Sequence, residues 1–261
     1  MSNLVRYAFA ALVAIAVSIP AKAEWEPTGE EFAGKSGNDF GLWMGVDVEK
    51  KINKKWSVGA EFEYRLKDNI DGSSWGEPAR WTLGIGAEYK VLKWLKLEAG
   101  YKFMRDHSCA EWNVEKYRES RGFWGTKHRF YFSATASYKY QNVKFSLRER
   151  WQYTYRPEVA DVTYDWEDDE FLPKKGKGKN VRRSRVMISY DKKGLWLEPF
   201  VSVEMYHGNG IEKMRYTAGC EFSAGKHNAF EVFYRFQDIM DDDNFNNRDS
   251  HILGINYKLK F

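Results

Sequence analysis

Apolar and polar residues alternate along most of this chain, from Phe40 to the last residue, in runs on the order of ten residues. Between Trp56 and Leu66 every second residue is apolar, and the residues between them are Ser57, Gly59, Glu61, Glu63 and Arg65. A β-strand points alternate side chains to opposite faces, so each run predicts a strand with one apolar and one polar face. Strands of this length are typical of barrels that cross a membrane.

The connections between these runs also alternate in length. Short links such as Asn53-Lys54 and Gln141-Asn142 are followed by longer polar ones, among them 106–126 and 156–179. A soluble β-sandwich also alternates apolar and polar residues. Long strands, aromatic residues near strand ends, and short turns opposite long loops favour a membrane barrel instead.

We therefore predict an all-β fold, a transmembrane up-and-down antiparallel β-barrel. About eleven runs can be marked, and a single-chain barrel of this class normally has an even number of strands. A further, poorly marked strand is expected at 24–33, with a turn at 34–38. The estimate is about twelve strands, with ten as the fallback.

The first residues have the features of a secretory signal. Arg6 supplies positive charge, residues 8–19 form a short apolar core, and Pro20 precedes the small-residue cleavage pattern Ala21-Lys22-Ala23. We expect residues 1–23 to be a signal peptide and residues 24–261 to form the barrel. The expected location is the outer membrane of a Gram-negative cell, after cleavage, in contact with membrane lipid and lipopolysaccharide.

The last strand ends with apolar residues at alternate positions, Tyr257, Leu259 and Phe261. This pattern resembles the signal read by the barrel-assembly machinery, which is therefore an expected partner. The chain also resembles the uncharacterised outer-membrane barrel family known as domain-of-unknown-function family 2490. Three features carry the resemblance: the start Asp39-Phe40-Gly41-Leu42-Trp43, the Glu61-x-Glu63-x-Arg65 strand after Trp56, and the Arg148-x-Arg150 strand. The resemblance implies no activity.

Charges of both signs fall on the polar face, which we assign to the lumen. The bases are Arg65, Arg80, Arg129, Arg148, Arg150, Arg183, Arg185, Arg215 and Arg235. The acids are Glu61, Glu63, Glu88, Glu98, Glu198, Glu204, Glu221 and Glu231. Charges in a narrow lumen must pair or stay hydrated. One interpretation is a charge-plugged structural barrel; the alternative is a narrow channel for small anionic solutes, because guanidinium groups match carboxylate and phosphate.

Other functional classes have weaker support. No sustained basic block indicates a nucleic-acid surface, and no His or Cys spacing indicates a metal site or a cofactor. A lipid-modifying enzyme is a second alternative, since Asp249, Ser250 and His251 are adjacent. Consecutive strand residues point in opposite directions, however, and a catalytic triad depends on geometry. We therefore expect a protein that is not an enzyme.

Overall fold

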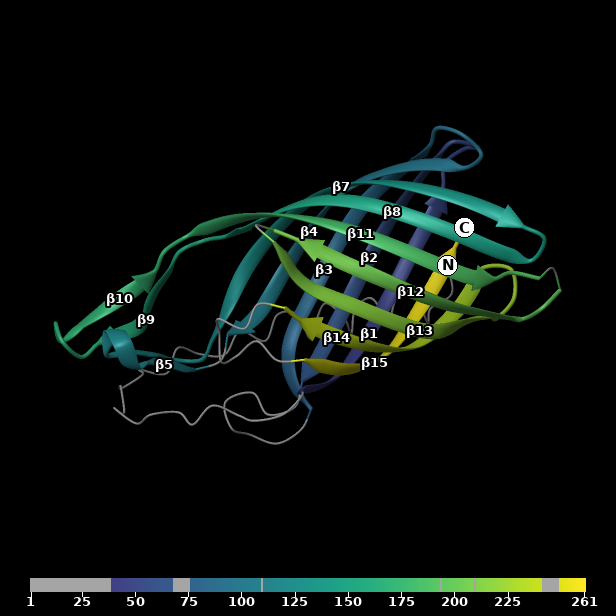
Figure 1. The fold of residues 1–261 in the computed structure, drawn as a ribbon. Coiled ribbons are helices and arrows are strands. Elements are labelled where there is room, and N and C mark those ends of the chain that lie inside the picture. Colours follow the sequence, from purple (N-terminus) through teal and green to yellow (C-terminus); the bar gives the residue numbers. More distant parts are fainter. Residues whose placement is uncertain (1–38, 68–75, 109, 193, 209, 241–248) are drawn as a thin grey trace, which may run out of the picture. The chain divides into compact units, whose positions relative to one another are not determined.

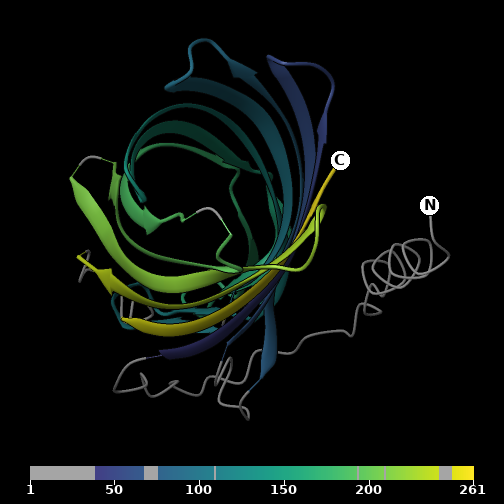
Figure 2. The same ribbon diagram turned by 90° about the vertical axis from the view of Figure 1, so that its right-hand side faces the viewer.

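The computed structural model describes residues 39–67, 76–108, 110–192, 194–208, 210–240 and 249–261. Eleven strands form a closed barrel, in the order β1-β15-β14-β13-β12-β11-β8-β7-β4-β3-β2 (Figures 1 and 2). They are β1 (Asp39–Lys51), β2 (Trp56–Lys67), β3 (Glu77–Lys90), β4 (Leu95–Ser108), β7 (Phe123–Tyr140), β8 (Val143–Arg156), β11 (Lys177–Tyr190), β12 (Leu197–His207), β13 (Ile211–Ser223), β14 (Asn228–Ile239) and β15 (Ser250–Lys260). The predicted β-barrel fold is confirmed.

The number of strands and the closing pair differ from the expectation. Ten neighbouring pairs are antiparallel, whereas β1 and β15 close the barrel in parallel, with Asp39 opposite Ser250 and Glu49 opposite Lys260. In a meander with an odd number of strands, the first and last strands run in the same direction and can meet only in parallel. Among the described residues the barrel is therefore closed by eleven strands. The strand expected at 24–33 and the signal peptide expected at 1–23 lie outside the described residues.

Connections at one end of the barrel, here called the short-turn end, are tight. Tyr140 pairs directly with Val143, and Gln141 takes a left-handed φ of 52° to make the reversal. The opposite end, here called the long-loop end, carries the longer links as expected. One exception is the link after β12, which contains only residues 208–210 because β13 begins at Ile211.

The outer face of the barrel is apolar, and many of its large side chains are exposed. Examples are Leu83, Ile85, Phe132, Val186, Val201, Val232 and Ile255, all more than two-fifths exposed. Exposed aromatic residues gather near the short-turn end: Trp56, Trp94, Tyr138, Tyr140 and Trp196. An apolar band with aromatic residues at its edge is the surface that a lipid bilayer requires.

Bulky side chains fill part of the barrel interior where the wall has glycine. Trp43, Phe233 and Ile252 form a buried cluster, with Phe200 packed against it. A side chain at Gly254 would overlap the Phe233 ring, whose carbon atoms lie 2.0–2.4 Å from the position of a Cβ there. Tyr131 is accommodated in the same way, with its hydroxyl over Gly86 and Gly100. These side chains therefore occupy part of the interior, and the open part of the lumen lies beside them, with Trp43 and Tyr131 in its wall.

Two of the long links form a small sheet of their own, where the sequence predicted loops. It has the strand order β10-β9-β6-β5 and comprises β5 (Glu111–Asn113), β6 (Arg118–Ser120), β9 (Val159–Asp165) and β10 (Glu170–Lys174), with a short 3-10 helix at Val114–Lys116. Val162 is fully buried, and Arg118 binds the buried Asp165 with Nε 2.7 Å from Oδ2. The polar composition of these two links gave no indication that their backbones would pair as strands.

Within the residues that the structure describes, no helix has the length and apolar character needed to cross a membrane.

Candidate functional site: the charged lumen

The barrel encloses a cavity of about 760 Å³. Fifteen lysine and arginine residues line it, together with eight aspartate and glutamate residues. They come from β1, β2, β3, β4, β7, β8, β11, β12, β13 and β14, because the inward face of every one of these strands is polar. The described wall of the cavity therefore carries an excess of positive charge.

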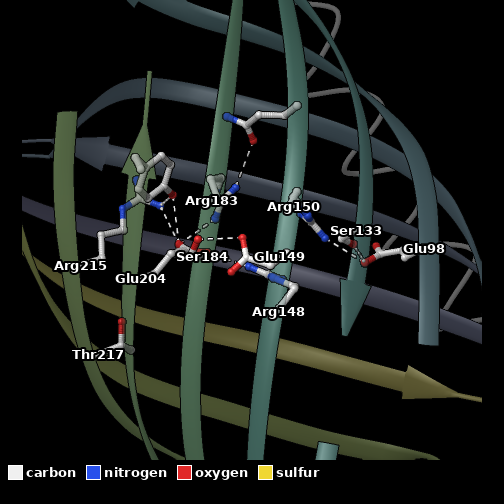
Figure 3. Close-up of polar contacts among 12 residues, drawn as sticks. Glu98, Ser133, Arg148, Glu149, Arg150, Arg183, Ser184, Glu204, Arg215 and Thr217 are labelled. Atoms are coloured by element: carbon white, nitrogen blue, oxygen red, sulfur yellow. Dashed lines mark hydrogen bonds and ion pairs between the residues drawn. The ribbon is translucent and has the colours of Figure 1, made fainter. Parts of the chain in front are cut away.

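Glu204 on β12 is the centre of the largest charge cluster (Figure 3). Its two carboxylate oxygens accept from Arg148 Nη2 at 2.7 Å and from Arg183 Nη2 at 2.8 Å, and Arg215 Nη1 lies 3.8 Å away. The Tyr206 hydroxyl also donates to Glu204 at 3.1 Å. One buried carboxylate thus holds three guanidinium groups from β8, β11 and β13.

A second cluster surrounds Glu98 on β4. Its carboxylate accepts from Arg150 Nη2 at 2.8 Å, from the Tyr131 hydroxyl at 2.9 Å and from the Ser133 hydroxyl at 3.0 Å. The Arg150 guanidinium also lies over the Tyr131 ring, 4.2 Å from its centroid. Figure 3 shows Arg150 reaching from β8 across to Glu98 and Ser133.

Most of the other predicted lumen charges pair with a neighbour. Arg65 Nη2 lies 2.7 Å from Glu63, and Arg80 binds Asp106, which Lys127 also binds. The remaining pairs are Glu61 with Lys102, Glu88 with Lys96 at 2.8 Å, and Glu221 and Glu231 with Lys258 at 2.7 and 2.5 Å. Glu198 accepts from the Ser189 hydroxyl at 2.7 Å.

Six cations that line the cavity have no carboxylate within 4.0 Å among the described residues: Arg129, Arg156, Lys177, Arg185, Lys213 and Arg235. Arg129 donates to the Thr154 hydroxyl at 2.9 Å, and Arg235 donates to the Thr217 hydroxyl at 2.9 Å. Lys213 lies over the Tyr206 ring, 4.6 Å from its centroid, and Arg185 makes no described hydrogen bond. These groups line the cavity and offer it uncompensated positive charge, which can bind an anion.

Charge also differs along the barrel axis. Six carboxylates lie within three residues of a strand end at the short-turn end: Glu49, Glu88, Glu98, Glu198, Glu221 and Glu231. All nine predicted arginines lie five or more residues from those strand ends. The lumen therefore has an arginine-rich half toward the long-loop end, whereas at the short-turn end carboxylates pair with lysines such as Lys96 and Lys258.

Most of the predicted charges line the cavity, although Glu198, Glu221 and Glu231 lie outside its lining. Several participants were not singled out from the sequence, including the cations Lys127 and Lys213 and the aromatic residues Trp43, Tyr131 and Tyr206. Their signal was present in the alternation, since each shares the inward parity of its strand. Asp106 was assigned to a loop because β4 extends further, to Ser108, than its apolar residues indicated.

The suggested catalytic cluster at the end of the chain is not brought together. Ser250 is buried, whereas the neighbouring His251 points the other way and has Nδ1 2.7 Å from the Tyr234 hydroxyl. The C-terminal residues take outward positions: the Tyr257 hydroxyl donates to Asn228 at 2.6 Å, and Phe261 is 54% exposed and stacks with His227.

Comparison with solved structures supports the fold. The chain is similar to the β domain of the Bordetella autotransporter BrkA, with a TM-score of 0.53 and 11% sequence identity, over 79% of this chain and 83% of that one. At this identity the likeness concerns the fold alone. No curated protein matches the sequence. The profile described as "Protein of unknown function (DUF2490)" matches residues 40–248, and the chain belongs to this family.

Proposed function

We propose that the protein is an outer-membrane barrel whose lumen binds small anionic solutes and lets them pass. The proposal rests on the excess of cations around the cavity, above all the six lining cations without a carboxylate partner among the described residues. The apolar outer face, its aromatic edge and the likeness to an autotransporter β domain support the membrane location.

The class of solute follows from the chemistry of the wall. Guanidinium groups bind carboxylate and phosphate oxygens in a planar, two-pronged geometry, whereas a lysine acts as a point charge. Arginines dominate the half of the lumen toward the long loops. Small organic acids and phosphorylated molecules are therefore the best candidates, and a cavity of about 760 Å³ limits their size.

A purely structural, charge-plugged barrel is the competing function. The clusters around the buried Glu204 and the half-buried Glu98 fit it, because each carboxylate accepts from several donors of the barrel wall. In a barrel whose charges serve only stability, cations without a partner would be destabilising, because an unpaired charge costs free energy wherever water is scarce. The presence of these unpaired cations favours the anion pathway over a structural plug.

The test is ion conduction through the purified, refolded protein in a planar bilayer. Replacing Arg129, Arg185 and Arg235 by glutamine removes three uncompensated charges and breaks no ion pair. We expect the ratio of anion to cation permeability to fall by roughly twofold or more, because local potential sets local ion concentration. The matched control is Arg105→Gln on β4, where the guanidinium donates to Thr126 on the outer face. An unchanged ratio in the triple variant would exclude the proposed role of these arginines.

A further inference from the structure

A group of polar residues interrupts the apolar outer face of the barrel on β8, β11 and β12. Glu149 follows the exposed Leu147 and precedes the exposed Trp151 on the same face of β8. Its carboxylate accepts from the Ser184 hydroxyl at 2.7 Å (Figure 3). Ser184 Oγ also lies 3.5 Å from His207 Nε2. The exposed Arg182 stands two residues from Ser184 on the same face of β11. We call Glu149, Arg182, Ser184 and His207 the outer polar patch.

The strand register places Glu149 near the middle of the membrane-facing band. One row of paired residues crosses nine strands, from Trp56 beside a short turn to Asp238 near a long loop. Glu149 is the central member of this row: Trp56, Tyr89, Leu97, Ala134, Glu149, Ser184, Met205, Met214 and Asp238. Because barrel strands are tilted, such a row climbs from one end of the barrel to the other. A carboxylate at its midpoint faces the lipid interior.

Neither charge in the patch has a counter-ion within the described chain. Glu149 receives one hydroxyl and forms no ion pair, and Arg182 makes no hydrogen bond or ion pair. A charged side chain facing lipid is costly and usually indicates a functional contact. Two neighbouring outward positions, Glu149 and Arg182, therefore carry charges of opposite sign that have no counter-ion in the described part of the chain.

An apolar groove lies next to the patch on the same face. It has a volume of about 530 Å³ and is lined mainly by Trp94, Ala136, Tyr138, Phe145, Leu147 and Val186. Leu147 and Val186 are each two residues from a patch member on the same strand face, so groove and patch form one surface. Because Ala136 is smaller than its neighbours, a hollow remains between them, and an apolar side chain of a second molecule can fill it.

We infer that this surface is the contact between two copies of the chain in the membrane. In a twofold-symmetric contact the same surface meets itself, so Glu149 of each copy faces Arg182 of the other. Two neighbouring, unpaired charges of opposite sign are thereby both neutralised, and each copy can place an apolar side chain in the other's groove. The inference rests on the proposed membrane location and is independent of anion passage.

Other occupants fit the patch less well. A phospholipid headgroup sits at the membrane surface, whereas the patch centre lies at mid-depth. Ester hydrolysis at Ser184 requires its proton to pass to His207, but the hydroxyl donates to Glu149 and the histidine is 3.5 Å away.

The experiment measures the oligomeric state of the full chain in detergent by light scattering, with folding checked by heat modifiability on gels. The wild type is expected to form a dimer. Glu149→Arg places like charges opposite each other twice and should raise the dimer dissociation constant by about tenfold or more. Combining it with Arg182→Glu restores opposite charges and should bring the constant back to within about threefold of wild type.

The groove is tested with a matched pair of substitutions. Ala136→Phe fills the groove and should weaken the dimer, whereas Ala218→Phe makes the same change at an exposed outward position on β13 and should not. A folded wild type that is monomeric would overturn the inference. So would a dimer unaffected by Glu149→Arg, failure of the charge-swapped double variant to recover, or a monomer that carries a bound phospholipid or hydrolyses one.

Discussion

Glu204 shows how a single residue organises the lumen. Its side chain is 7% exposed and lies within 4.0 Å of guanidinium groups on three strands. Such a carboxylate links strands β8, β11 and β13 to β12 through side chains, in addition to the backbone ladder. It also lowers the positive charge of the arginine-rich half, so we expect the same residue to affect both stability and the proposed anion selectivity.

Replacing Glu204 by glutamine should therefore have two effects. Breaking a buried ion cluster by removing one partner costs about 3 kcal/mol or more, because the remaining charges are left uncompensated. We expect the heat-modifiability transition to shift to lower temperature, while the open protein becomes more anion-selective. Glu88→Gln is the matched control, since its pair with Lys96 is more exposed and contributes at most about 1 kcal/mol. Equal melting temperatures for the two variants would contradict this account.

At the scale of elements, the ion pair between Arg118 and Asp165 joins two neighbouring strands of the small sheet. The hydrogen bond from Arg118 to Asp165, together with backbone hydrogen bonds from Glu167 and Asp168, holds the pKa of the Asp165 carboxyl below its ordinary value. The ionised form is thus favoured in the folded sheet. Its stabilisation is complete above the ordinary aspartate pKa of about 3.9 and disappears as the pH falls through the lower, folded value.

Hydrogen exchange of the amides in 159–174 tests this dependence. Asp165→Asn should increase exchange at pH 7, and the wild type should show a similar increase only under strong acid, below pH ~4. Asp161→Asn is the control: Asp161 is exposed, forms no described ion pair, and has a φ of 53°, which asparagine tolerates. Protection that is insensitive to Asp165→Asn would show that backbone pairing alone holds the sheet.

The alternation of apolar and polar residues predicted the barrel strands well. It did not predict where some strands end or which distant segments pair. The runs of alternating apolar and polar residues identified β2 and β8, because the two faces of a membrane-barrel strand meet different surroundings. The end of β4 extends beyond its apolar residues, so Asp106 was assigned to a loop. The parallel β1–β15 pair and the β9–β6 pair are formed by backbone hydrogen bonds between distant segments. The polarity of the side chains does not predict such pairing.

The lumen charges were predictable by type and by face, but their pairing was not. Parity along a strand assigns Arg148, Arg150, Arg183 and Glu204 to the inside. The register between strands decides that Arg148 and Arg183 share Glu204 while Arg150 reaches Glu98. Which cations remain without a partner, and therefore what the lumen can bind, follows only from that register.

For the whole molecule, the central feature is the concentration of arginines in the half of the barrel toward the long loops. At the short-turn end most carboxylates are paired with cations, for example Glu88 with Lys96 and Glu231 with Lys258. If the lumen conducts as we propose, the cations without a partner should dominate ion selection, because local potential sets local ion concentration.

The zero-current potential of the wild-type protein in a planar bilayer under a potassium chloride gradient tests this account most directly. The account predicts stepwise conductance and a potential with the sign of chloride selectivity. Cation selectivity, or a folded and inserted barrel that conducts nothing, would contradict the proposed anion pathway and favour the charge-plugged structural barrel.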